Sequence, residues 1–211
     1  MILVEDEVLS PSAPGRMLVI ACGAIARELL EVIRLNHLSH ITVECLPGKL
    51  HNTPRDIAPR VEARLTAAAG RYDQVFVAYA DCGTGGMLDR VLERHGVERI
   101  PGAHCYEFFL GGAEFSRIHE EEPGTFYLTD FLCRHFERFV IQGLKLDKFP
   151  QLTPQYFGNY RRLVYLAQTE SRELVDLGRR AADYLGLDYQ VRRTGYGDLE
   201  STLLHFAGTA V

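Results

Sequence analysis

Three cysteines are the residues of this sequence whose type and surroundings could do chemistry. Cys22 lies in the segment LVIACGA, Cys82 in VFVAYADCGTGG and Cys105 in IPGAHCYE. Thiolates are ligands for zinc and for iron, and three of them leave a fourth coordination position open for water or substrate. A cysteine can also act as a nucleophile when its pKa is lowered. The three residues therefore predict a metal site or a reactive thiol.

A fourth ligand is available from three nearby side chains. His104 and Glu107 flank Cys105, and His51 precedes a predicted helix. Imidazole and carboxylate groups both bind zinc and iron, and histidine can also move protons at neutral pH. There is no CxxC or HExxH spacing, so a metal site here depends on the fold bringing the cysteines together.

The remaining two cysteines are predicted to be structural. Cys45 lies inside an apolar strand segment, and Cys133 lies on the expected buried side of a helix. Free cysteine is among the most frequently buried residue types. The total of five cysteines is odd and no export signal precedes them, which favours reduced thiols over a disulfide framework.

The glycine-rich turn after Cys82 could bind an anion through backbone N–H groups. It lacks the Gly-Lys-Ser/Thr of a phosphate-binding loop and the GxGxxG of a dinucleotide site, so a tight turn without a ligand is the alternative. Arginine pairs well with carboxylate or phosphate, and tyrosine can line a pocket. The predicted ligand-binding residues are Gly23, Arg55, Gly83, Thr84, Gly85, Gly86 and Tyr196.

Alternating strands and helices must position these residues. Apolar runs with the length of buried strands alternate with segments of helical periodicity, which predicts an α/β fold. The fold is expected to be an open, mostly parallel sheet with helices on both faces. Parallel strands bring their carboxyl ends to one edge, where the three cysteines would meet. The strands are predicted at 17–22, 41–48, 75–80, 97–100, 126–128 and 163–169, with a last strand that ends near 194–198.

The predicted domain organisation rests on a change in residue composition near the middle of the chain. Residues 1–16 are predicted to be a flexible lead-in, and 17–211 a single α/β domain. The aromatic-rich stretch at about 104–160 is expected to be a helical insertion over the carboxyl ends of the strands. The alternative is two lobes, at about 17–103 and 104–211.

Composition and charge exclude several classes of function. The chain is 46% hydrophobic and 24% charged, as expected of a globular protein, and its formal net charge of -5 gives no basis for nucleic-acid binding. The first residues, MILVEDEV, contain acids where a signal peptide needs bases, and no apolar run reaches the length of a membrane span. We expect a cytoplasmic protein without membrane contact that binds a small molecule; homo-oligomerisation stays open.

Several segments together resemble a bacterial and archaeal family, domain of unknown function 1638. They are ACGAIARELL (21–30), LHNTPRDI (50–57), VAYADCGTGG (77–86), PGAHCYEFFLG (101–111), GTFYLTDFLCRHFE (124–137) and TGYGDLE (194–200). The resemblance implies an association with corrinoid-dependent methyl transfer and one-carbon metabolism, and a corrinoid or methyltransferase protein as partner. It also points to Cys22, Cys82, Cys105, His51 and the Gly83–Gly86 turn.

The leading hypothesis is a metal-binding protein that holds zinc or iron, including an iron–sulfur centre, through the three cysteines. It would be an enzyme or an accessory factor in corrinoid-linked methyl transfer. Two alternatives stay open. One is a non-catalytic module that binds a small anion, and the other is a thiol enzyme that uses Cys82 or Cys22.

Overall fold

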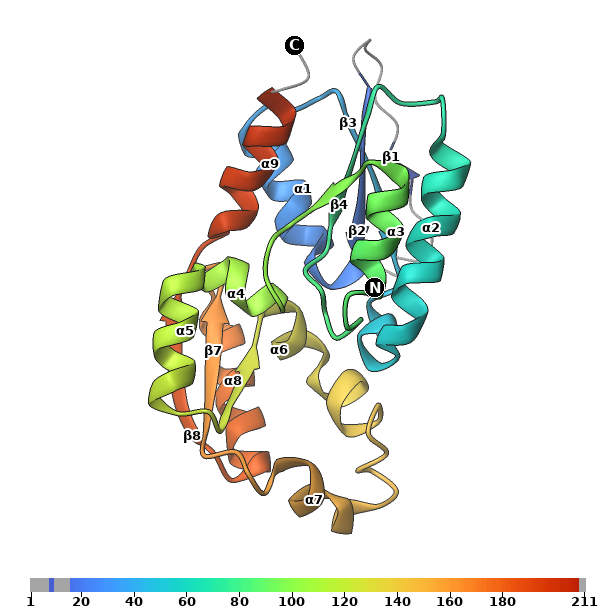
Figure 1. The fold of residues 1–211 in the computed structure, drawn as a ribbon. Coiled ribbons are helices and arrows are strands. Elements are labelled where there is room, and N and C mark those ends of the chain that lie inside the picture. Colours follow the sequence, from blue (N-terminus) through green and yellow to red (C-terminus); the bar gives the residue numbers. More distant parts are fainter. Residues whose placement is uncertain (1–7, 10–15, 209–211) are drawn as a thin grey trace. The chain divides into compact units, whose positions relative to one another are not determined.

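The computed structural model describes residues 8–9 and 16–208 (Figure 1). The chain divides into two compact units. The first runs to Phe108 and resumes at Asp198, and the second comprises Phe109–Gly197. Each unit is built around its own parallel sheet. No helix in the described ranges is both long and apolar enough to cross a membrane.

The sheet of the first unit has the strand order β1-β3-β2-β4-β5. Strands β2 to β5 are parallel, and β1 pairs antiparallel with β3. Of the predicted lead-in, residues 1–7 and 10–15 lie outside the described residues. The strands are β1 (Val8–Leu9), β2 (Met17–Cys22), β3 (Ile41–Leu46), β4 (Gln74–Ala78) and β5 (Glu98–Arg99).

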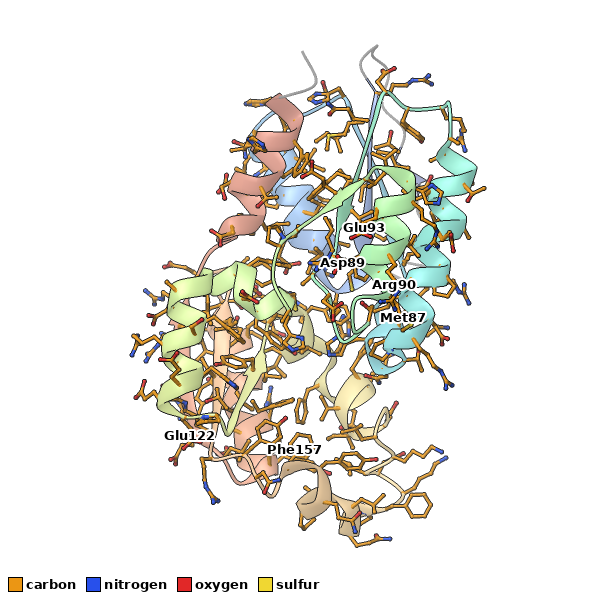
Figure 2. All side chains as sticks on the ribbon, in the orientation of Figure 1. Met87, Asp89, Arg90, Glu93, Glu122 and Phe157 are labelled. Carbon is orange, nitrogen blue, oxygen red and sulfur yellow. The ribbon has the colours of Figure 1, made fainter. Side chains whose placement is uncertain are left out.

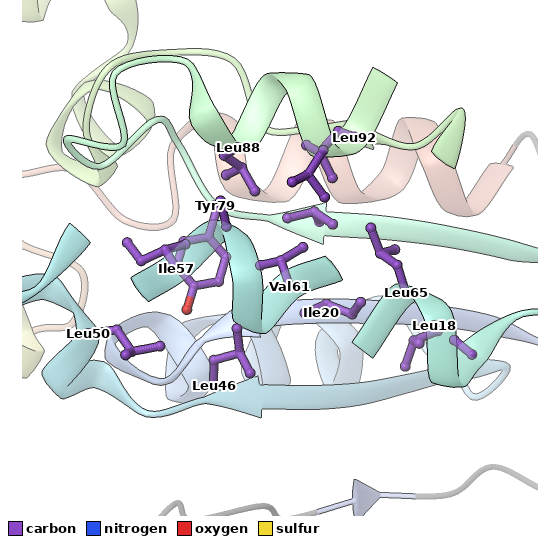
Figure 3. Close-up of a cluster of buried hydrophobic side chains, with 14 residues drawn as sticks. Leu18, Ile20, Leu46, Leu50, Ile57, Val61, Leu65, Tyr79, Leu88 and Leu92 are labelled. Atoms are coloured by element: carbon purple, nitrogen blue, oxygen red, sulfur yellow. The ribbon is translucent and has the colours of Figure 1, made fainter. Parts of the chain in front are cut away.

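Helices cover both faces of this sheet (Figure 1). Alternate residues of a strand point to opposite faces, so Leu18 and Ile20 of β2 pack towards α2 and α3 in the core drawn in Figure 3. On the other face, Phe76 of β4 stacks on Phe206 of α9, with ring centroids 4.2 Å apart. Both faces are buried, which explains why the strands are continuous apolar runs. The helices are α1 (Ala26–Leu35), α2 (Ile57–Ala68), α3 (Met87–His95) and α9 (Asp198–Gly208). A short helix, α4 (Cys105–Leu110), begins in the first unit and ends in the second.

The second unit contains the parallel sheet β6-β7-β8. Phe115 of α5 packs on Tyr127 of β6, and Tyr189 of β8 donates a hydrogen bond to a carbonyl of α8 from the opposite face. The strands are β6 (Thr125–Leu128), β7 (Arg162–Ala167) and β8 (Asp188–Arg193). The helices are α5 (Gly112–Glu121), α6 (Asp130–Phe136), α7 (Thr153–Phe157) and α8 (Arg172–Leu185), and a π-helical turn, Glu137–Ile141, follows α6.

The predicted α/β class with mostly parallel strands is confirmed, but the strands form two sheets instead of one. The strand predicted at 163–169 pairs with β6 and β8 and does not extend the first sheet. The stretch at 104–160, expected to be a helical insertion, contributes β6 to the second sheet. The chain then returns to the first unit, because α9 packs against α1 and β4.

Candidate functional site

Cys22 is the last residue of β2 and begins the loop that follows it. Its Sγ accepts a hydrogen bond from the N–H of Ala24 at 3.4 Å, so the thiol caps the 3₁₀ turn Gly23–Ile25. Gly23 lies against the loop after β3, because a Cβ on Gly23 would come 2.9 Å from the carbonyl oxygen of Leu46 and 3.1 Å from the N atom of Gly48. The Cys22 loop therefore lies directly beside the loop of the neighbouring strand.

Cys82 lies in the turn after β4 and has a left-handed backbone, with φ of 51°. This conformation is energetically unfavourable for a non-glycine residue, so it persists only where the surrounding structure stabilises it. Here the support comes from two backbone hydrogen bonds, one from Asp81 N to the Gly102 carbonyl (3.0 Å) and one from Cys82 N to the Ala103 carbonyl (2.8 Å). The segment before α4 thus holds Cys82 in place.

The glycine turn is organised by Asp81. One carboxylate oxygen accepts from the Thr84 hydroxyl (2.5 Å) and from Gly86 N (3.0 Å), and the other accepts from Gly85 N (3.2 Å). These hydrogen bonds, together with the Arg99 charge, lower the pKa of Asp81 despite its partial burial. The N–H groups of Gly85 and Gly86, expected to bind an external anion, therefore already bind an internal one.

Cys105 is the first residue of α4. Glu107, two residues later, accepts a hydrogen bond from Ala103 N at 2.7 Å and so stabilises the turn that leads into this helix. A Cβ on Gly102 would lie 2.9 Å from the same carboxylate. Glu107 thus positions the segment that carries Cys105.

The three thiols lie close enough to influence one another's charge. Cys82 interacts electrostatically with Cys22, and Cys105 interacts with both. All three residues are half-buried and all are free thiols. We refer to Cys22, Cys82 and Cys105 as the three-cysteine site. Although 60 and 23 positions separate them along the chain, the fold gathers them at the carboxyl edge of one parallel sheet.

Burial raises the pKa of all three thiols. For Cys22, desolvation raises the pKa by more than the hydrogen bond from Ala24 lowers it. Burial and the nearby Cys22 raise the pKa of Cys82 to about 12. The pKa of Cys105 is raised well above its usual value, first by burial and then by the other two sulfurs. All three are therefore neutral at pH 7.

Tyr79 places a polar group in the apolar floor of this site. The residue is 2% exposed, and within the described part of the chain its hydroxyl has no partner in regular hydrogen-bond geometry. Burial raises the pKa of Tyr79, and Tyr79 and Cys22 perturb each other's pKa. Figure 3 shows the ring among Ile57, Leu50 and Leu46. Tyr79 was not among the predicted site residues, although a hydroxyl within the apolar run VFVAYA was a usable signal.

Two histidines lie next to this edge. His51, in the 3₁₀ turn Gly48–Asn52, and His104 both keep exposed side chains. Desolvation by nearby protein atoms and the charge of His104 lower the pKa of His51, so the two imidazoles are neighbours. Arg55 lies exposed in the next 3₁₀ turn, Pro54–Asp56, and Pro54 approaches the glycine turn, since a Cβ on Gly83 would lie 3.4 Å from its Cγ.

Two findings differ from the predicted site. No three His, Cys, Asp or Glu side chains within residues 8–9 and 16–208 are placed to hold a metal ion as they stand. Tyr196, predicted as a pocket residue, belongs to the second unit, whereas the three-cysteine site belongs to the first.

Cys45 and Cys133 are buried, at 7% and 2% exposure, as predicted for structural cysteines.

Arg99 is a second residue that sequence reasoning missed. Its guanidinium donates to both carboxylate oxygens of Asp89 (2.6 and 3.1 Å) and to the carbonyls of Ile100 and Gly102. Figure 2 shows Asp89 on α3. It therefore anchors the segment that supports Cys82, and its charge opposes the rise in the pKa of that thiol. In the sequence it is one arginine among many, and only the fold distinguishes it.

Gly23→Ala is expected to destabilise the first unit by about 1–3 kcal/mol, because the new methyl group would press on the backbone of Leu46 and Gly48. Thermal and urea unfolding measure the change. Gly208→Ala is the matched control, since a Cβ there meets nothing within 4 Å. Equal stability of the two variants would contradict the close contact between these loops.

Comparison with known proteins gives one match. The family model described as protein of unknown function (DUF1638) matches residues 45–203. This range includes Cys82 and Cys105 and leaves out Cys22. Neither a curated protein nor a solved structure matches the chain.

Proposed function

Since the chain belongs to the DUF1638 family, which carries no assigned function, we propose a function from its own residues: Cys22, Cys82 and Cys105 hold a thiolate-ligated metal centre of zinc or iron. The observation that carries this proposal is the gathering of three half-buried thiols, from three separate segments, at the carboxyl edge of a parallel sheet. Ligand sites of open α/β sheets occur at this edge. His51 or His104 would supply a fourth ligand.

The types of the residues at this site suit a thiolate-ligated metal centre better than the spacing of their side chains does. Soft thiolate ligands select zinc and iron–sulfur centres over magnesium or calcium. The side chains do not converge on one point, so single-ion binding requires the thiols to rotate inwards, whereas an iron–sulfur cluster spans a wider set of cysteines. A cation at this site would also compensate the cost of ionising three buried thiols.

The two alternatives have less support. A thiol nucleophile works as the thiolate, and burial keeps Cys22 and Cys82 protonated at pH 7. An anion-binding module would need free N–H groups in the glycine turn, and the Asp81 carboxylate accepts those of Gly85 and Gly86. The link to corrinoid-dependent methyl transfer rests on the family resemblance and stays a prediction, as does the cytoplasmic location.

Metal analysis of the full chain tests the proposal. Protein purified without oxygen, or reconstituted with Zn²⁺ or with Fe²⁺ and sulfide, is expected to retain metal in stoichiometric amount through gel filtration. Cys22→Ser, Cys82→Ser and Cys105→Ser should each reduce the content at least tenfold, because a missing thiolate removes a strong ligand. An iron–sulfur cluster would also give visible absorption.

Two further variants make the result interpretable. Cys82→Gly removes the thiol but relieves the left-handed backbone, so loss of metal in this variant cannot be attributed to strain. Cys133→Ser changes a buried cysteine of the second unit and should leave the metal content unchanged. The proposal would be refuted if the wild-type protein retained neither zinc nor iron. It would also be refuted if all three serine variants retained the full wild-type metal content.

A further inference from the structure

The second unit contains a cavity of about 600 Å³ that the three-cysteine site does not use. It lies at the carboxyl ends of β7 and β8, against the first turn of α8, and all of its lining residues belong to the second unit. The volume is within the range of small-molecule sites, and this edge is where parallel α/β sheets bind ligands.

The cavity has an apolar floor. Ala167 and Val191 come from the adjacent strands β7 and β8, and Val175 comes from α8. A ligand that fills the cavity would therefore gain from placing hydrocarbon against the floor.

The rim of the cavity is cationic. Arg172 opens α8 and Arg193 ends β8, and both line the cavity. Arg193 forms an ion pair with Glu170 at 3.6 Å, and the two side chains are 80% and 83% exposed. An ion pair this exposed is weak, so a ligand carboxylate can compete with Glu170 for the guanidinium. Two arginines against one glutamate favour a negatively charged ligand group at this rim.

Thr169 adds a directional contact. Its hydroxyl hydrogen is donated to Asp130, a carboxylate with no exposed surface, and this bond fixes the oxygen at the cavity wall. A hydroxyl that donates inwards can only accept from a ligand. The wall therefore offers an acceptor beside the arginines, which suits a ligand that also carries a hydroxyl or amino group.

From these three features we propose that the cavity binds a small organic carboxylate, with its carboxylate group at Arg172 and Arg193 and its aliphatic part on Ala167, Val175 and Val191. The proposal concerns a second site, in a different unit from the three-cysteine site, and does not depend on metal binding.

Titration of the full-length ¹⁵N-labelled protein with hexanoate tests the proposal. We expect saturable shifts confined to resonances around 167–175 and 191–193, with a Kd on the order of 1–10 mM. Butyrate should bind roughly tenfold more weakly, because it lacks two methylene groups for the floor. Hexylammonium and inorganic phosphate should leave these resonances in place.

Variants locate the carboxylate group. Arg172→Ala and Arg193→Ala should each weaken hexanoate binding about tenfold, and Arg193→Lys by less, because the positive charge remains. Arg180→Ala removes an exposed cation from the same helix outside the cavity and should change the Kd less than twofold. Val191→Phe should abolish binding by filling the floor, and the dispersion of each spectrum reports whether the variant is folded.

The results that would overturn the proposal are specific. Hexanoate that causes no saturable shift in the cavity, equal affinity for butyrate and hexanoate, or equal binding of phosphate would each show that the cavity does not recognise an organic carboxylate. Equal effects of the alanine changes at 180 and 193 would show that any affinity comes from net charge alone.

Discussion

Asp130→Leu is expected to destabilise the second unit by about 3–5 kcal/mol, the cost of removing one partner from a buried charged network. The Asp130 carboxylate is 0% exposed and accepts hydrogen bonds from the Tyr165 hydroxyl (2.6 Å), from Gln168 N (3.0 Å) and from the Thr169 hydroxyl. Arg134, one turn along α6, lies 3.7 Å from the same group. Leucine would leave the buried donors of Tyr165 and Gln168 without an acceptor.

Hydrogen exchange separates this effect from a general loss of stability. Amides of β6, β7 and β8 should lose protection in the leucine variant, while those of β2 and β4, in the other unit, should keep more of it. Asp130→Asn retains one oxygen acceptor and should lose roughly half as much stability; Tyr165→Phe removes a single donor and should cost about 1 kcal/mol. A leucine variant as protected as the wild type would show that this network contributes little.

The strands β2, β4 and β7 could be predicted because most of their residues are buried on both faces. MLVIAC and VFVAYA are uninterrupted apolar runs, and the segment at Leu163 has the same character. The first of these coincides with β2, and the second overlaps β4 with a shift of one or two residues. Local composition therefore determined where these strands lie.

The pairing of the strands could not be predicted from the same information. Nothing in LVYLAQT indicates whether it extends the first sheet or begins another, since parallel pairing joins segments that are distant in sequence. In the structure β7 pairs with β6 and β8. The partition into two sheets depends on packing across many residues, which no short pattern encodes.

The cysteines were identifiable from their positions after apolar strands, but their surroundings were not. The carboxylate of Asp81 accepts hydrogen bonds from the N–H groups that were predicted to bind an external anion. The left-handed backbone of Cys82 and the buried hydroxyl of Tyr79 are consequences of tertiary contacts. Residue type and spacing thus indicate a site, whereas its electrostatics require the fold.

Zinc binding at the three-cysteine site is expected to weaken about a thousandfold for each unit by which the pH falls, because the metal displaces one proton from each of three thiols. The direction follows from the raised pKa values. A thiol stays protonated below its pKa, and the pKa of Cys82 is about 12, with those of Cys22 and Cys105 also raised. Ordinary thiols, with a pKa of about 8.5, would lose this dependence above about pH 9. Here the dependence should persist to a higher pH than it does for ordinary thiols.

Calorimetry in buffers of different ionisation enthalpy counts the protons directly. Zinc binding to the metal-free full chain at pH 7.5 should release about three protons per ion, and Cys105→Ser should release about two with weaker binding. Chelator competition between pH 7 and pH 10, corrected for protonation of the chelator, gives the slope. Release of one proton or none would mean that the thiols are already ionised. That result would favour the alternative hypothesis, in which Cys22 or Cys82 acts as a thiolate nucleophile. Three protons, with a slope that stays near three beyond the pH range of ordinary thiols, require half-buried thiols that are neutral at pH 7.5 and jointly bound to the ion.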